Sequence, residues 1–221
     1  MLSSMEEPSS PVKAVRRYDV SGRRDRALRN RENLIEVAER LFLRDGYPAT
    51  TVGRIAAAAG VSNETVYKAF GGKAGMVRAI QENRLLGAGP IPAPDRSDEI
   101  SATERDPAAM LRGWATLATE VAPRVAPIML LVRSAAATDA DMAALMTDMA
   151  SQRLDRMAHN ARRLAVRGSL RRGVTLERAR DVLFAYTAPE LYEVLVIHRR
   201  WSLEEFGDFI YRGLVAELLE R

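Results

Sequence analysis

The sequence predicts an all-α protein with a small N-terminal domain and a larger C-terminal domain. Apolar residues recur at helical spacing along most of the chain, and no stretch shows the apolar–polar alternation of a half-buried strand. No internal repeat is present. With 221 residues, 47% of them hydrophobic, the chain is long enough to bury a substantial core.

Glycine and proline residues separate the expected helices. In the N-terminal part we expect a helix from about Arg26 to Asp45, stopped by Gly46, and then two short helices on either side of Gly60. A fourth helix is expected over about 73–86. The three prolines that follow Gly87 end it and open a long connection.

The larger C-terminal part is also expected to be helical. Thr175 is placed to cap one helix, and Ser202 opens the last one, from Leu203 to Leu219. Pro189 either kinks the helix after Thr175 or starts a new one. The remaining helices are expected over residues 107–120, 124–137 and 141–166, followed by a turn over 168–173.

Residues 46–76 read as two short helices joined by a glycine-centred turn, which is a helix-turn-helix. The first helix has one apolar face, formed by residues at positions i, i+3, i+4 and i+7: Val52, Ile55, Ala56 and Ala59. Ser62 can cap the second helix, which keeps a polar face free to enter a DNA major groove.

In these residues the chain resembles the tetracycline-repressor (TetR) family of bacterial transcription regulators. The resemblance is carried by Gly46-Tyr47, Thr50-Thr51-Val52, Ile55-Ala56, Ala59-Gly60-Val61-Ser62, Thr65-Val66-Tyr67, Phe70 and Lys73. The resemblance implies a DNA-binding domain over 23–72 and an effector-binding and dimerisation domain over 73–221, with the helix from 73 as connector. Residues 1–22 are rich in Ser, Pro and Glu and then basic, so they are expected to form a flexible basic arm. Whether the arm contacts DNA stays open.

Thr51 and Lys73 begin helices, where unpaired N–H groups suit phosphate binding, and Tyr67 would add a phenolic hydrogen bond. The resemblance implies that all three contact phosphates. It also places a second set at or near base edges: Ser62, Asn63, Thr65 and Lys68. Tyr67 could equally serve as a packing residue.

Asn63 and Lys68 are our candidates for reading sequence, because asparagine can pair with adenine and lysine can donate to guanine. Arg54 stands where the family often has an acidic residue, and it could be an extra phosphate contact. Glu64 could accept from cytosine, although an acidic residue near a helix N-terminus usually complements the helix dipole.

Charge and composition agree with DNA binding and narrow the alternatives. Residues 1–90 hold 15 Lys and Arg against 10 Asp and Glu, whereas the rest of the chain holds 18 against 19. There is no cysteine, which excludes disulfides and thiolate sites. Because neither a signal sequence nor an apolar run of ~20 residues is present, a cytoplasmic protein without a membrane role is expected.

The C-terminal half is the expected site of effector binding and dimerisation. Six of the nine methionines lie there, and flexible thioethers suit a pocket for apolar ligands, although they also fill ordinary cores. The candidate ligand-binding residues are Met110, Trp114, Met129, Arg133, Met146, Met149 and Tyr186. For Arg133 an ion pair is the commoner explanation. Leu191 and Leu214 are candidate dimerisation residues, in the segments 175–198 and 202–219.

No pattern points to an enzyme, a metal site or a cofactor. The chain lacks a Gly-rich phosphate loop, a Gly-x-Ser-x-Gly motif and a His-Glu-x-x-His motif, and its two histidines, His159 and His198, lie far apart. The resemblance implies a homodimeric repressor that a small, largely apolar effector releases from a palindromic double-stranded operator. The alternatives are a DNA-binding protein without a ligand and an all-helical protein-interaction module.

Overall fold

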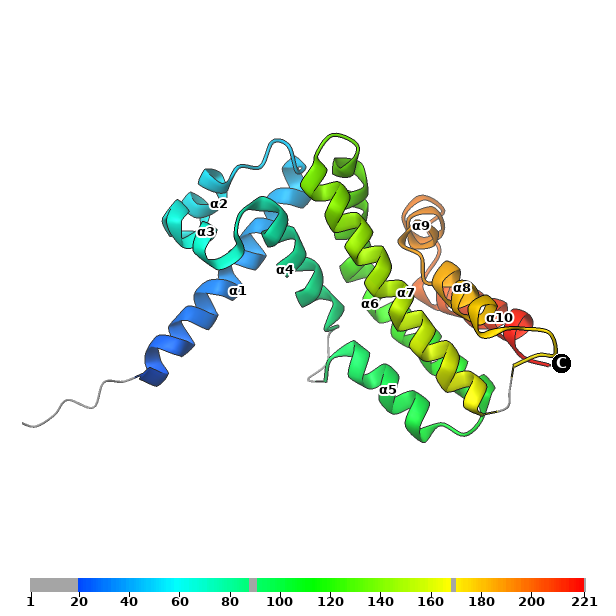
Figure 1. Ribbon diagram of the computed structural model, residues 1–221. Helices are drawn as coiled ribbons and strands as arrows, with labels where there is room; N and C mark the ends of the chain where they lie inside the picture. The colour runs from blue at the N-terminus through cyan, green and yellow to red at the C-terminus, as the bar shows by residue number, and fades with distance from the viewer. Residues whose placement is uncertain (1–19, 88–90, 168–169, 221) are drawn as a thin grey trace, which may run out of the picture.

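The computed structural model describes residues 20–87, 91–167 and 170–220 (Figure 1). Within these ranges every named element is a helix, so the all-α prediction is confirmed, and the only extended pairing is a single bridge between Leu170 and Leu219. The basic arm predicted over residues 1–22 lies almost wholly outside the described residues. Helix α1 already begins at Val20, earlier than the expected start near Arg26.

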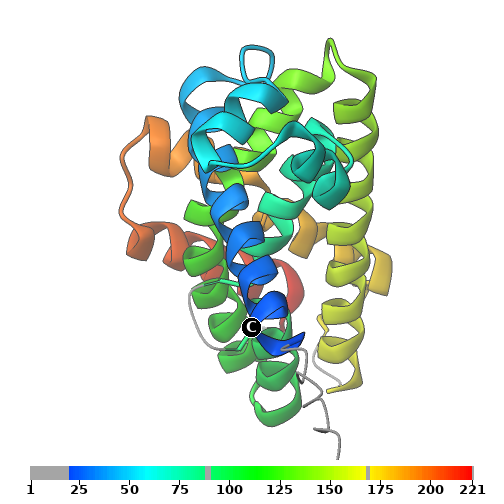
Figure 2. The same cartoon turned by 90° about the vertical axis from the view of Figure 1, so that its left-hand side faces the viewer.

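Three helices form the N-terminal domain: α1 (Val20–Asp45), α2 (Val52–Ala59) and α3 (Asn63–Phe70). The turn between α2 and α3 forms because Gly60 adopts a left-handed conformation with a φ of 69°, which costs glycine little. Figure 2 shows this domain facing the viewer, with α1 running down the front of the larger domain.

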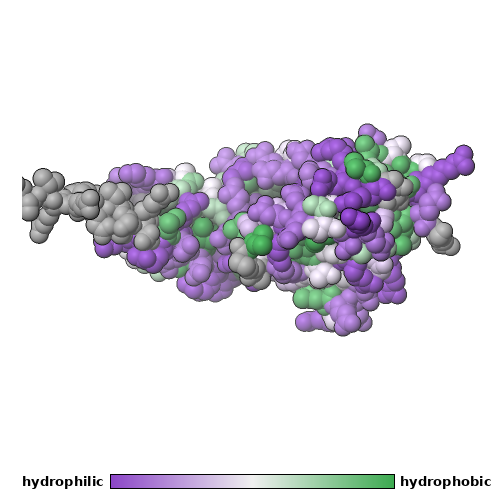
Figure 3. All heavy atoms as spheres, turned by 90° about the horizontal axis from the view of Figure 1, so that it is seen from below, coloured by the Kyte–Doolittle hydropathy of each residue, from purple (hydrophilic) through white to green (hydrophobic). Residues whose placement is uncertain are grey.

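The C-terminal domain follows as a bundle around two long helices, α6 and α7 (Figure 1). Its elements are α4 (Lys73–Leu85), α5 (Ala93–Thr103), α6 (Pro107–Ala136), α7 (Ala140–Val166), α8 (Leu176–Tyr186), α9 (Pro189–Tyr192), the π-helical segment η1 (Glu193–His198) and α10 (Leu203–Leu218). Seen from below, its surface is mostly hydrophilic, with hydrophobic residues in small groups (Figure 3).

The core of the N-terminal domain does not stop at the domain boundary. Phe42 of α1 is fully buried and stacks on Tyr47, and the same cluster continues through Met76 and Ile80 of α4. It then reaches the C-terminal half of α6 and the N-terminal half of α7, ending at Met149. A second cluster holds α6, α8 and α10 together. The first cluster therefore joins the two domains.

Helix α6 corrects the prediction of two helices over 107–120 and 124–137. The chain continues as one helix through Pro123 and Pro127, although each proline removes a backbone donor. It continues because α6 is the central element, in contact with α1, α4, α5, α7, α9 and α10. By length and composition alone α6 would be able to cross a membrane, but the core helix of a soluble protein passes the same test.

Helix α5 was missed, because the sequence predicted only a connection after Gly87. Its buried face consists of small residues, Ala93, Ser97 and Ser101, so the segment has no apolar stripe to detect. It packs closely on α6, where Gly113 leaves room for Ile100. The question left open at Pro189 is answered, because this proline occupies the first turn of a new helix, α9.

Two glycines of the N-terminal region should respond oppositely to alanine. A Cβ on Gly75 would lie 1.8 Å from the carbonyl oxygen of Phe70, whereas a Cβ on Gly53 meets no atom closer than 3.9 Å. Gly75→Ala should therefore lower the free energy of unfolding by ~1–3 kcal/mol through overpacking. Gly53→Ala should raise it by up to ~1 kcal/mol through helix propensity. Urea denaturation of both variants measures this, and similar values would contradict the packing described.

Candidate functional site

The exposed face of α3 carries the polar residues predicted to meet DNA. Val66 is fully buried and Phe70 packs against the same core cluster, which leaves the polar side chains of the helix exposed. Ser62 caps α3: its hydroxyl accepts from the N–H of Thr65 at 3.2 Å and lies 2.9 Å from the Thr65 hydroxyl. Four further residues of this face are exposed, namely Asn63, Glu64, Tyr67 and Lys68.

Thr51 and Arg54 are partly engaged within the domain. The Thr51 hydroxyl caps α2 by accepting from the N–H of Arg54 at 3.2 Å. The Arg54 guanidinium donates to the Ala49 carbonyl at 2.8 Å and to the Asp45 carboxylate at 2.7 Å. Asp45 also accepts two hydrogen bonds from Arg44. The hydrogen bond from Arg44 and the weaker one from Arg54 together lower the pKa of Asp45 to about 2, so the carboxylate stays charged at neutral pH.

Lys73 has a structural partner as well as its predicted phosphate role. Its Nζ donates to the Tyr47 carbonyl at 2.7 Å and lies 4.0 Å from the centre of the Tyr47 ring. Burial lowers the pKa of Lys73, and the charge of Asp139 opposes that shift. Because an ammonium has three donors, the contact with Tyr47 positions Lys73 and still leaves donors for a phosphate.

Helix α1 contributes contacts that sequence reasoning missed. Arg31 donates to the Ala69 carbonyl at 3.2 Å, and its guanidinium lies 4.5 Å from the centre of the Phe70 ring. Asn33 donates to the Ala59 carbonyl at 3.4 Å. Both bonds satisfy carbonyls at helix C-termini, so α1 fixes the ends of α2 and α3. The spacing of these two polar residues in the sequence is the same as that of residues on an ordinary solvent-exposed helix face, so it does not indicate the contacts.

A pocket of about 340 Å³ opens inside the C-terminal domain. Its volume is at the lower end of typical small-molecule sites, ~300–1,000 Å³. Its wall is mostly apolar and comes from α4, α5, α6, α7, α8, α10 and the residues leading into α9. Gln81 and Leu85 of α4 belong to this wall, so one helix touches both the pocket and, at its other end, the helix-turn-helix.

Three of the seven predicted ligand-binding residues line this pocket: Trp114, Met129 and Met149. The indole N–H of Trp114 donates to the Ser97 carbonyl at 3.3 Å, which fixes the ring. Met149 is also part of the core cluster that joins the two domains.

The other four predicted ligand-binding residues do not line the pocket. Met110 is fully buried in the second core cluster, and Met146 lies on the surface with 40% of its area exposed. The Tyr186 ring packs on Gly213 of α10, and a Cβ added to Gly213 would lie 2.2 Å from this ring. Arg133 pairs with Glu190 and Glu193 outside the pocket, at 3.3 and 2.7 Å, which was the commoner explanation.

Polar residues of the pocket wall also went unpredicted. Gln81, Ser97, Gln152, Arg153, Arg156, Asn160 and Thr187 all contribute to it. They come from helices whose polar positions look like solvated faces in the sequence. Only the packing of α5 against α7 turns several of them inward.

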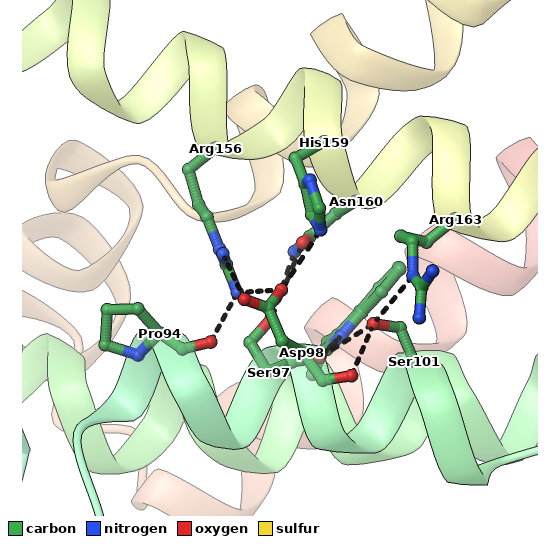
Figure 4. A network of polar contacts seen from close by, with 9 residues as sticks. Pro94, Ser97, Asp98, Ser101, Arg156, His159, Asn160 and Arg163 are labelled. Atoms are coloured by element: carbon green, nitrogen blue, oxygen red, sulfur yellow. Dashed lines mark hydrogen bonds and ion pairs between the residues drawn. The ribbon is translucent and has the colours of Figure 1, made fainter.

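A polar network joins α5 to α7 beside the pocket (Figure 4). Asp98 of α5 accepts from Arg156 and lies 3.1 Å from the His159 ring nitrogen. Burial favours the protonated form of Asp98, but the hydrogen bond and charge of Arg156 outweigh it and lower the Asp98 pKa. The amide of Asn160 faces the Ser97 hydroxyl at 3.4 Å. His159 thus belongs to a structural network, and the described residues contain no cluster able to hold a metal.

The structure corrects one of the two candidate dimerisation residues. Leu214 is only 1% exposed and lines the pocket, so it lies in the core of the protomer. Leu191 is half-buried and packs against the second core cluster. The exposed apolar residues of the same region are Leu176, Val194, Ile197 and Leu203, each 42–48% exposed.

Comparisons with known proteins agree with this geometry. Residues 34–80 match the family model described as bacterial regulatory proteins, tetR family. No curated protein sequence matches the chain. Among solved structures, SmeT in complex with triclosan is 23% identical with a TM-score of 0.69, over 87% of this chain and 92% of that one. SmeT is the repressor of a Stenotrophomonas maltophilia multidrug efflux pump.

Two further solved structures are similar over most of their length. The fatty acid degradation regulator FadR from Bacillus halodurans is 18% identical with a TM-score of 0.69, over 87% of this chain and 97% of that one. A transcriptional regulator from Saccharomonospora viridis in complex with choline is 21% identical with a TM-score of 0.63, over 88% and 100%.

The helix-turn-helix, its position on a helical bundle and these similarities define a DNA-binding transcription regulator. Residues 34–80 are similar to the DNA-binding region of the TetR family of bacterial regulatory proteins, and the fold of the whole chain is similar to that of solved regulators.

Arg54 supplies a test of the DNA-binding face, because Asp45 now holds its guanidinium. Asp45→Asn removes a negative charge beside the DNA-binding face and frees Arg54 for a phosphate. Affinity for random duplex DNA should rise, and the slope of log affinity against log salt should steepen by about 1. Titrations at several salt concentrations measure this. The same substitution in an Arg54→Ala background is the control, and an equal steepening there would exclude Arg54 as the contact.

Proposed function

We propose that this protein is a cytoplasmic, homodimeric repressor that a small effector releases from a palindromic operator. The observation that carries the proposal is the position of α4. Its first residue, Lys73, contacts the chain that leads into α2, and its last turns supply Gln81 and Leu85 to the pocket. A ligand that displaces the end of α4 would therefore also displace the helix-turn-helix.

Two ion pairs extend this connection to neighbouring helices. Arg84 of α4 donates to both carboxylate oxygens of Glu39 in α1, and its Nε lies 2.8 and 2.9 Å from them. Arg78 pairs with Asp148 of α7 at 2.7 Å. Because α1 also fixes the ends of α2 and α3, movement of α4 would be transmitted to α3 by two routes. The buried face of α4 provides one, and Arg84 the other.

The DNA contacts proposed here divide into two groups. Thr51, Lys73 and Tyr67 would hold phosphates, with Arg54 as an additional contact, and the exposed face of α3 would read bases. Base edges would be met by Ser62, Asn63, Thr65 and Lys68. Their exposure on one face of α3 supports this division. One helix of eight residues reads few bases, so a dimer with two-fold symmetry and a palindromic operator would supply the required specificity.

Two solved structures with similar folds support a small-molecule effector. SmeT holds triclosan and the regulator from S. viridis holds choline, so similar folds accept ligands of different chemistry. The pocket of this chain also supports a small-molecule effector, because its mostly apolar wall suits a largely apolar molecule.

The central test of the proposed function is reciprocity between effector and operator. Selection of bound genomic fragments supplies the operator. A ligand screen that starts with triclosan and choline can follow Trp114 fluorescence in a Trp201→Phe variant, which leaves Trp114 as the only tryptophan. The operator should weaken effector binding by the same factor by which the effector weakens operator binding, typically ~5–150-fold. Equal effector affinities with and without the operator would reject release by allostery.

The dimer is tested on the outer surface of the α8–α10 region. Val194 and Ile197 of η1 are 48% and 42% exposed, so Arg at either position leaves the protomer core intact. Each substitution should shift sedimentation from dimer to monomer, because it buries an unpaired charge in the interface. Ile91→Arg is the control, since Ile91 is 46% exposed and outside this region. Dimers that survive both substitutions would place the interface elsewhere.

A further inference from the structure

Arg153 of α7 lines the pocket and is held in place by α8. Its guanidinium carbon lies 3.4 Å from the centre of the Phe184 ring. Its Nη1 donates to the Phe184 carbonyl at 2.6 Å and to the Thr187 hydroxyl at 3.4 Å. These contacts fix the orientation of the guanidinium but bring no negative charge to it.

The Nε atom of Arg153 is buried and has no hydrogen-bond partner among the described residues. No acidic side chain in the described ranges forms an ion pair with Arg153 either. The carboxylate whose charge it feels, Glu190, is bound to Arg133. Burial accordingly lowers the pKa of Arg153 to about 10, with Glu190 opposing the shift, so the group remains a cation at neutral pH.

Arg156, the second arginine of the pocket wall, differs from Arg153 because its charge is paired. Arg156 pairs with the Asp98 carboxylate at 2.9 Å and donates to the Pro94 carbonyl at 2.6 Å (Figure 4). Two arginines one helical turn apart therefore line the same pocket, but of the two only Arg156 forms an ion pair with a carboxylate among the residues that the structure describes.

Arg153 is partly buried. A partly buried cation without a countercharge is unfavourable, and a buried donor without an acceptor adds to the cost. Stacking on Phe184 and the two neutral acceptors offset part of it. What remains is removed when an anion enters the pocket, because a guanidinium binds a carboxylate or similar group through charge-assisted hydrogen bonds. The rest of the wall is mostly apolar and offers such a ligand a place for a hydrocarbon or aromatic body.

We propose that the pocket binds an amphiphilic anion, an apolar molecule with one carboxylate or comparable acidic group, and that this group pairs with Arg153. The proposal rests on the proposed role of the pocket as the effector site, and it specifies the ligand class. The acidic group would lie beside the Nε of Arg153, and the apolar body would extend toward Trp114 and Met149.

Probes with the same apolar body and either a charged or a neutral head group test this assignment. Decanoate is compared with decanol, and naphthoate with naphthalenemethanol, by titration of Trp114 fluorescence in the Trp201→Phe background. At neutral pH at least one carboxylate should bind about tenfold or more tightly than its alcohol. Arg153→Met should remove that preference while the alcohol still binds, because methionine keeps an apolar side chain against Phe184 without the charge. Arg153→Lys should restore part of it.

The control removes the other arginine together with its countercharge. In the double variant Arg156→Met, Asp98→Asn the pocket loses a neutral pair and keeps Arg153, so the preference for the carboxylate should persist. A purely structural role for Arg153, holding the end of α8, predicts instead that Arg153→Met lowers thermal stability and leaves the ratio of the two affinities unchanged. That result would overturn the proposal.

The remaining outcomes separate this proposal from the proposed function. Equal binding of carboxylate and alcohol by the unmodified pocket overturns the assignment of an anion and leaves an effector site in place. If none of the four probes binds, the amphiphilic anion is wrong as a ligand class. Operator release by a neutral or cationic ligand would then show that the regulator works without the chemistry proposed for Arg153.

Discussion

The buried face of α4 is the constraint on which the rest of the structure depends. Met76, Val77 and Ile80 lie in a hydrophobic cluster that begins in α1 and ends in α7, so the two domains share one core. A close-packed core has discrete arrangements and transmits strain. We therefore expect a change in the position of α3 to be coupled to α4, and a shift of α4 to alter the pocket that its last turns help to line.

The helices and the turn of the N-terminal domain were predicted well from the sequence, because local signals specify them. Gly60, the Ser62 cap and the buried Val66 of α3 act within a few residues of one another. The side-chain partners of Lys73 and Arg54 were not predictable in the same way. Tyr47 and Asp45 reach them only after the turn that follows α1 has folded back.

The pocket was predictable in kind but not in detail. Its apolar character follows from methionines and an aromatic residue in the C-terminal half of the chain. Its polar wall depends on α5, a helix that has no apolar stripe and was not predicted. Small residues such as Ser97 and Ser101 form a helix here because they permit close packing against α6 and α7. The same tertiary packing carries α6 through Pro123 and Pro127, against local propensity.

Arg153 shows how these levels combine. In the sequence it is one of many arginines on a long amphipathic helix, and its distinction comes from what its neighbours already bind. Asp98 pairs with Arg156, and Glu190 pairs with Arg133. Neither carboxylate therefore forms an ion pair with Arg153, the arginine that lines the pocket. Because α7 also carries Asp148, which pairs with Arg78 of α4, a ligand that neutralises Arg153 would act on a helix directly bonded to the connector. The proposed charge recognition and the proposed transmission to the DNA-binding domain would thus involve the same helix.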